Sequence, residues 1–126
     1  IERERLLSLN PEIFFLDVNG LSIFEKELAE APGFFMNFKA VRENKVFTIL
    51  PYNYYNTNVA LALSDAYFVG KVTYPKAFKD IEIDHEADRI IRFFVKEAVF
   101  SDIKKNFGIF GKVTFENRKM KVMPLR

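Results

Sequence analysis

Two short apolar stretches with a helical segment between them decide the fold of this chain. Residues 12–18 read Glu-Ile-Phe-Phe-Leu-Asp-Val, and residues 45–50 read Lys-Val-Phe-Thr-Ile-Leu. The first stretch is continuously apolar rather than alternating, which is typical of a strand covered on both faces. Residues 22–31 between them have a helical apolar pattern, opened by Ser22 and Glu25 at capping-box spacing. A strand, a helix and a second strand predict a βαβ unit with parallel strands.

The rest of the chain supplies flanking helices and a distinct tail. Residues 2–9 predict a short helix, which Asn10-Pro11 ends because proline disfavours helical backbone in the residue before it. Residues 57–72 predict a helix that is apolar nearly all round. Residues 84–100 predict a second helix, and one face of it carries Ala87, Ile90, Ile91, Phe94, Val95 and Ala98.

The predicted fold class is α/β, with a small parallel sheet and flanking helices. We expect residues 1–111 to form one lobe, truncated at its start. Residues 112–126 form a basic tail whose alternating pattern predicts a possible β-hairpin.

Composition excludes several classes of function. The chain has 126 residues, 49% of them hydrophobic, which fits a folded domain and excludes intrinsic disorder. It has no cysteine and one histidine, so thiol catalysis and cysteine-ligated zinc are excluded. A net charge of +2 argues against a nucleic-acid partner. The sequence lacks a glycine-rich phosphate loop and a nucleophile elbow, so we expect the chain not to be an enzyme and to have no catalytic residue and no cofactor. The best alternative, a catalytic pair, would be Asp17 with Asp65.

Three stretches resemble a known family when they are read in order. Residues 4–16 are similar to a helix end of the form E-x-L-L-x-L-N-P-D that runs into a buried strand, and residues 40–49 are similar to A-V-K-N-G-R-V-Y-x-V. Residues 60–71, followed by 74–78, are similar to a late helix ending in G-K-x-L-Y-P-E-x-F. Together they resemble the C-terminal lobe of the solute-binding proteins of ABC importers for iron–siderophore complexes, haem and cobalamin.

The resemblance implies a transport function outside the cytoplasm. It implies a chain that binds a chelated metal such as a ferric siderophore and delivers it to an ABC permease, in the periplasm or anchored at the cell surface. The partner lobe would be an N-terminal lobe of the same protein, which this chain lacks. The alternatives are a haem or cobalamin receptor of the same family, or an α/β interaction domain without a transport role.

The predicted ligand site is the loop after the second strand. Loops at the carboxyl ends of parallel strands line the crevice in which open α/β sheets bind ligands. The loop consists of Tyr52, Asn53, Tyr54, Tyr55 and Asn56. Phenol rings give broad contact with a polar edge, which suits a large chelate, and a phenolate could alternatively bind ferric iron directly. Asn19 follows the first strand, and we expect it on the same rim.

Two carboxylates near the start of the chain are the predicted permease contacts. In the resembling family an exposed Glu at the place of Glu4 docks against arginines of the permease, and Glu2 is the neighbouring candidate. A carboxylate at a helix start is stabilised by the helix dipole and can accept a bidentate arginine. The acids of residues 80–88 open a helix rather than surround a metal, so we expect no metal site.

Two further interactions are possible for the ends of the fold. The basic residues after 111 could approach anionic lipid, although a solvated edge is the simpler interpretation. Open strand edges in a truncated lobe predict self-association.

Overall fold

A computed structural model describes residues 2–117 and 119–125, which belong to two compact units. Unit 1 contains the described residues up to Thr48 together with Gly111–Leu125. Unit 2 runs from Ile49 to Phe110. The predicted division into a lobe over 1–111 and a tail from 112 groups the residues differently, since the strands of the tail belong to unit 1.

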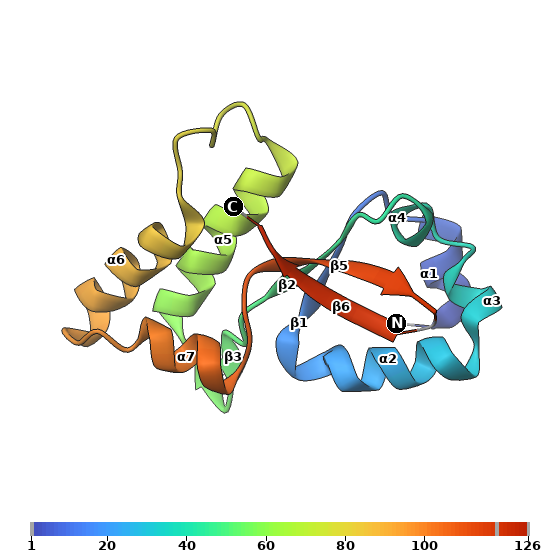
Figure 1. The fold of residues 1–126 in the computed structure, drawn as a ribbon, viewed down its shortest axis with the longest axis horizontal. Helices are drawn as coiled ribbons and strands as arrows, with labels where there is room; N and C mark the ends of the chain where they lie inside the picture. Colours follow the sequence, from blue (N-terminus) through green and yellow to red (C-terminus); the bar gives the residue numbers. More distant parts are fainter. Residues whose placement is uncertain (1, 118, 126) are drawn as a thin grey trace. The chain divides into compact units, whose positions relative to one another are not determined.

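Unit 1 is built on a four-stranded sheet with the order β1-β2-β5-β6 (Figure 1). The pair β1–β2 is parallel, whereas β5 runs antiparallel to β2 and to β6. The βαβ unit and the small α/β fold are therefore confirmed, in a sheet of mixed direction. The predicted hairpin is also confirmed, with Val113 opposite Val122 and Phe115 opposite Met120. The strands are β1 (Phe14–Asp17), β2 (Val46–Ile49), β5 (Gly111–Glu116) and β6 (Lys119–Pro124).

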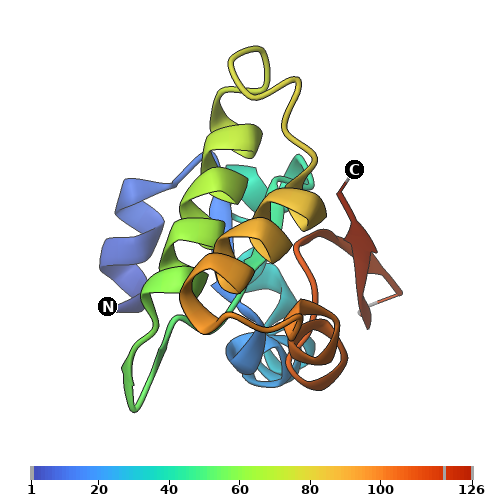
Figure 2. The same ribbon diagram turned by 90° about the vertical axis from the view of Figure 1, so that its left-hand side faces the viewer.

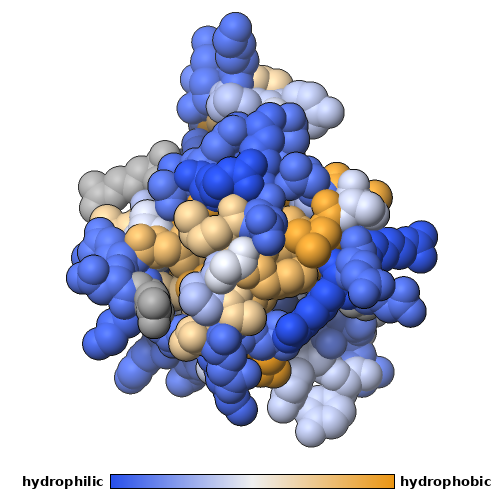
Figure 3. All heavy atoms as spheres, turned by 90° about the vertical axis from the view of Figure 1, so that its right-hand side faces the viewer, coloured by the Kyte–Doolittle hydropathy of each residue, from blue (hydrophilic) through white to orange (hydrophobic). Residues whose placement is uncertain are grey.

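The helices of unit 1 lie in the first part of the chain and form its core together with the sheet. Val46 and Val113 are partners across β2 and β5, and both are fully buried. They pack with Leu28, Phe35 and other apolar residues in one cluster. Figure 3 shows apolar side chains reaching the surface on the face that carries these helices. The elements are α1 (Arg3–Leu9), η1 (Val18–Gly20), α2 (Leu21–Glu30), α3 (Pro32–Phe35) and α4 (Lys39–Arg42).

The start of α2 differs from the prediction. A capping box at Ser22 and Glu25 was expected, but α2 begins at Leu21 after a 3-10 turn, and Gly20 caps it without a side-chain hydrogen bond. The Asp17 carboxylate accepts a hydrogen bond from the Asn19 amide and so supports this turn. The Glu25 carboxylate instead accepts a hydrogen bond from the Met120 amide at 3.3 Å, which links α2 to β6.

Unit 2 is mainly helical. Its long helices α5 (Val59–Thr73) and α6 (Ile83–Val95) pack side by side, as both ribbon views show (Figures 1 and 2). The short helix α7 (Phe100–Asn106) contacts α6, and a small antiparallel pair, β3 (Asn53–Tyr54) and β4 (Asn56–Thr57), precedes α5. Phe68 is fully buried and its ring lies 4.9 Å from that of Phe110.

The second long helix is shorter than its apolar period predicts. It ends at Val95 because Lys96 adopts a left-handed conformation, with φ at 66°. Ala87, Ile90 and Ile91 are buried as predicted, but Phe94 and Val95, which were expected on the same buried face, are exposed. The stretch after 96 forms the separate helix α7.

Candidate functional site

The candidate site is a pocket in unit 2, directly after the end of β2. Its volume is about 540 Å³. Its walls come from the β3–β4 pair, the first turn of α5 and the helix α7. The lining residues are Pro51, Tyr54, Asn56, Thr57, Asn58, Leu61, Ile103 and Phe107. They are apolar or neutral, so the pocket suits an uncharged, partly aromatic surface with a few hydrogen-bonding groups.

Local backbone interactions shape the loop that forms one wall of the pocket. The predicted loop folds back on itself as the β3–β4 pair, in which Tyr54 is opposite Asn56. Tyr55 lies at the turn with φ at 64°, and the Asn58 amide donates a hydrogen bond to the Tyr52 carbonyl at 2.7 Å. The loop is therefore a defined hairpin that presents Tyr54 and Asn56 to the pocket.

The start of α5 is anchored by two polar side chains. Asn58 caps the helix, and its side-chain oxygen accepts a hydrogen bond from the Leu61 amide at 3.1 Å. The buried Asp65 carboxylate accepts a hydrogen bond from the Leu50 amide at 2.9 Å, which ties α5 to the residue just after β2. These bonds fix the start of α5 and connect that helix to the chain just before the pocket.

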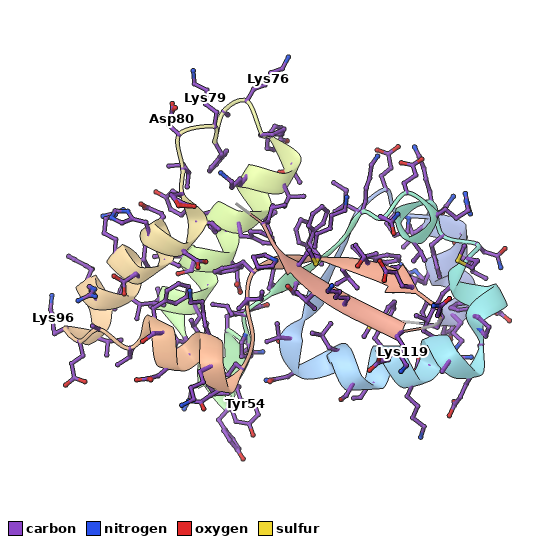
Figure 4. The ribbon with its side chains drawn as sticks, viewed as in Figure 1. Tyr54, Lys76, Lys79, Asp80, Lys96 and Lys119 are labelled. Carbon is purple, nitrogen blue, oxygen red and sulfur yellow. The ribbon has the colours of Figure 1, made fainter. Side chains whose placement is uncertain are left out.

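The structure brings together part of the predicted ligand set. Tyr54 and Asn56 line the pocket. Tyr52 and Asn53 are exposed outside its lining, and Tyr55 is 92% exposed, with its ring 4.6 Å from that of Tyr54. Figure 4 shows Tyr54 projecting from this end of unit 2. The predicted loop is thus placed at a pocket, but its residues are divided between the lining and the surrounding surface.

Asn19 lies in the other compact unit. It is exposed in η1, next to Asp17, so its predicted place on the rim of the ligand site stays a prediction. The alternative catalytic pair is divided in the same way, since Asp17 belongs to unit 1 and Asp65 to unit 2.

Sequence reasoning missed the wall formed by α7. Ile103 and Phe107 line the pocket opposite residues that precede them by about fifty positions. No motif in residues 100–107 indicated which other segment they would contact. Asp84 holds α7 against α6, because its carboxylate accepts a hydrogen bond from the Lys104 ammonium at 2.7 Å.

The predicted permease contacts are accessible. Glu2 precedes α1 as its N-cap residue and Glu4 lies in the first turn, and both are exposed. Between them, Arg3 pairs with Glu27 at 3.8 Å, and its guanidinium lies 5.4 Å from the centre of the Phe34 ring. Arg3 thus contacts α2 and α3, although its side chain stays largely exposed.

Three of the five acids of residues 80–88, namely Asp84, Glu86 and Asp88, form ion pairs. Asp88 pairs with Arg92, and Glu86 pairs with Arg89, whose hydrogen bond lowers the pKa of the Glu86 carboxyl. Among residues 2–117 and 119–125, no three histidine or acidic side chains converge as metal ligands would. Over the same residues, no helix is both long and apolar enough to cross a bilayer.

Comparison of the sequence with protein-family models and with curated proteins gives no match. The family resemblance of the three sequence stretches therefore remains a hypothesis, and the pocket has to be judged on its own residues.

Proposed function

We propose that this chain is a ligand-binding lobe of an extracytoplasmic solute-binding protein, which delivers a metal chelate such as a ferric siderophore to an ABC importer. In this proposal the chain binds and releases its ligand and catalyses no reaction. A second lobe of the same protein would close over the ligand, and Glu4, with Glu2 beside it, would dock on the permease. Haem and cobalamin are the alternative ligands.

The observation that carries the proposal is the position and lining of the pocket. It follows β2, one of the two parallel strands, and the predicted tyrosine loop contributes Tyr54 and Asn56 to it. Ligands in open α/β sheets bind beyond the carboxyl ends of the strands. The ordered likeness of residues 4–16, 40–49 and 60–71 with 74–78 to one family supports the same function.

The lining favours a neutral and bulky ligand surface. Tyr54, Leu61 and Phe107 give broad apolar contact, and the amide of Asn56 can donate and accept hydrogen bonds at the ligand edge. A chelate with its charges directed inward toward the metal presents such a surface. A lobe of this kind forms half of a crevice, so the chain alone should bind more weakly than a complete clamp.

A titration tests the proposal. The chain has no tryptophan and five tyrosines, so its intrinsic emission reports on tyrosines, three of which lie in residues 52–55. We expect a ferric hydroxamate siderophore, a ferric catecholate siderophore, haemin or cyanocobalamin to quench this emission saturably. Quenching must be corrected for absorption by the ligand, and equilibrium dialysis provides an independent measure of binding.

Two tyrosines give a matched pair of variants. Tyr54 is 61% exposed and lines the pocket, whereas Tyr74 is 69% exposed and lies outside the lining. We expect Tyr54→Ala to weaken binding of the active ligand about 2- to 10-fold, the effect of one aromatic contact, and Tyr74→Ala to leave it unchanged. Equal effects of the two variants, or no binding of any of the four ligands, would contradict the proposal.

A further inference from the structure

Unit 2 has an apolar groove that is separate from the candidate ligand pocket. It consists of two adjoining pockets of about 350 Å³ and 270 Å³, which share Leu63 and Tyr67 of α5. Phe93 and Phe94 of α6 line the larger pocket, with Arg89 beside them, and Phe78 lines the smaller one. The larger pocket lies along the junction of α5 and α6, and the smaller one continues it between α5 and Phe78.

The aromatic rings of the groove stand at the surface. Phe93 is 66% exposed and Phe94 is 48% exposed, and their rings pack edge to face at 5.3 Å. Single apolar residues on a surface are ordinary, but two exposed rings that flank an apolar groove are typical of an interaction surface. The same face thus carries both a projection and a hollow to receive one, as a self-complementary interface requires.

Charge is segregated along α6. The segment that opens the helix carries Glu82, Asp84, Glu86 and Asp88, whereas the closing part carries Arg89, Arg92 and Lys96. Figure 4 shows Asp80 on the loop that leads into α6 and Lys96 at the far end of the helix. The Glu86–Arg89 and Asp88–Arg92 pairs lie within one copy, so the charges that can act between copies are the exposed Glu82 at one end and Lys96 at the other. Two copies of α6 packed antiparallel would place Glu82 of each near Lys96 of the other, whereas a parallel arrangement would place like charges together.

We propose that this groove, defined by Leu63, Tyr67, Phe93 and Phe94, is the interface of a symmetric dimer of this chain with its two α6 helices antiparallel. If the helices cross at Arg89, Glu82 of each copy faces Lys96 of the other, since both lie seven residues from the crossing point. Arg89 can lie at the two-fold axis because its own Glu86 neutralises it. The dimer does not depend on the proposed ligand function.

Sedimentation of the 126-residue chain tests the apolar part of the interface. We expect a concentration-dependent dimer, and we expect Phe93→Glu to raise its dissociation constant at least about 30-fold, as for an aromatic residue central to an interface. Ile23→Glu is the matched control, because Ile23 is 63% exposed on α2 in unit 1. A wild-type chain that stays monomeric up to its solubility limit, or equal effects of both substitutions, would overturn the proposal.

A charge exchange tests the antiparallel orientation. Glu82→Lys and Lys96→Glu should each weaken the dimer, because each places like charges opposite one another, and the double variant should restore it. Circular dichroism of each variant reports whether the fold is retained. If the losses of dimer affinity from the two single changes add up in the double variant, the helices do not pair in this way and the proposed orientation is wrong.

Discussion

Asp65 is a buried charged side chain that joins two segments of unit 2. Its carboxylate accepts a hydrogen bond from the Leu50 amide, and Leu50 is fully buried. Asp65→Ala should lower the free energy of unfolding by about 1–3 kcal/mol, because a buried N–H would lose its partner. Asp65→Asn keeps an acceptor oxygen for the Leu50 amide, so it should lower the free energy of unfolding less than Asp65→Ala does. Urea denaturation of both variants measures the difference, and equal stability of Asp65→Ala and the wild type would contradict the prediction.

The exposed pair of Glu12 and Lys39 has a predictable pH dependence. The Lys39 Nζ atom lies 2.7 Å from Glu12 Oε1. This hydrogen bond from Lys39 lowers the pKa of the Glu12 carboxyl below its ordinary value of 4.5. A lowered pKa in the folded state means that the pair stabilises the fold above about pH 4.5, and that this contribution disappears as the pH falls through the lowered pKa.

Variants of Lys39 and Lys45 separate the effect of the Lys39 hydrogen bond on the Glu12 pKa from the effect of the Lys45 charge. In an NMR titration, Lys39→Met should raise the Glu12 pKa toward its ordinary value, and Lys45→Met should raise it less, since Lys45 acts only through space. The stability difference between Lys39→Met and the wild type should also shrink below pH 4.5. An unchanged Glu12 pKa in Lys39→Met would show that the pair does not form in solution.

At the scale of elements, Gly70 sets how the turn after α5 packs on that helix. A Cβ at position 70 would overlap the Phe78 ring, which also packs edge to face on Tyr67 at 6.2 Å. Replacement of a helical glycine by alanine usually stabilises a protein by about 0.5–1 kcal/mol. Here we expect Gly70→Ala to destabilise by about 1–3 kcal/mol, as overpacking does.

Thermal unfolding of a double variant identifies the cause. In a Phe78→Ala background the overlap is absent, so Gly70→Ala should give the usual small gain. Gly33→Ala is the control, because a Cβ at Gly33 of α3 would meet no atom within 4 Å. A gain from Gly70→Ala in the wild-type background would mean that the ring moves aside at little cost.

At the scale of the whole molecule, each unit has its own buried centre. Val113 belongs to the core cluster of unit 1, and Phe68 packs against Phe110 in unit 2. We expect Phe68→Leu to reduce hydrogen-exchange protection in α5 and α6 at least about fivefold, equivalent to ~1 kcal/mol, with less effect on β5, and Val113→Ala to do the reverse. Uniform losses in both variants would show that the two units open as one.

Much of the fold was predictable because it depends on the local spacing of apolar residues along the chain. The continuous apolar run of residues 12–18 and the stretch 45–50 correspond to the parallel strands β1 and β2. The alternation after residue 112 corresponds to the β5–β6 hairpin. Spacing of apolar residues determines which face of a segment can be buried, and that information lies within a few residues of chain.

Contacts between residues far apart in the sequence were decided only by the tertiary structure. It paired β5 with β2, so that Thr48 is opposite Gly111, and it placed α7 beside Tyr54 and Asn56 to complete the candidate pocket. It also ended α6 at Val95 and left Phe93 and Phe94 exposed, although the apolar period predicts burial for Phe94. Periodicity shows which side of a helix is apolar, but whether another segment covers that side depends on residues far along the chain or on a second molecule.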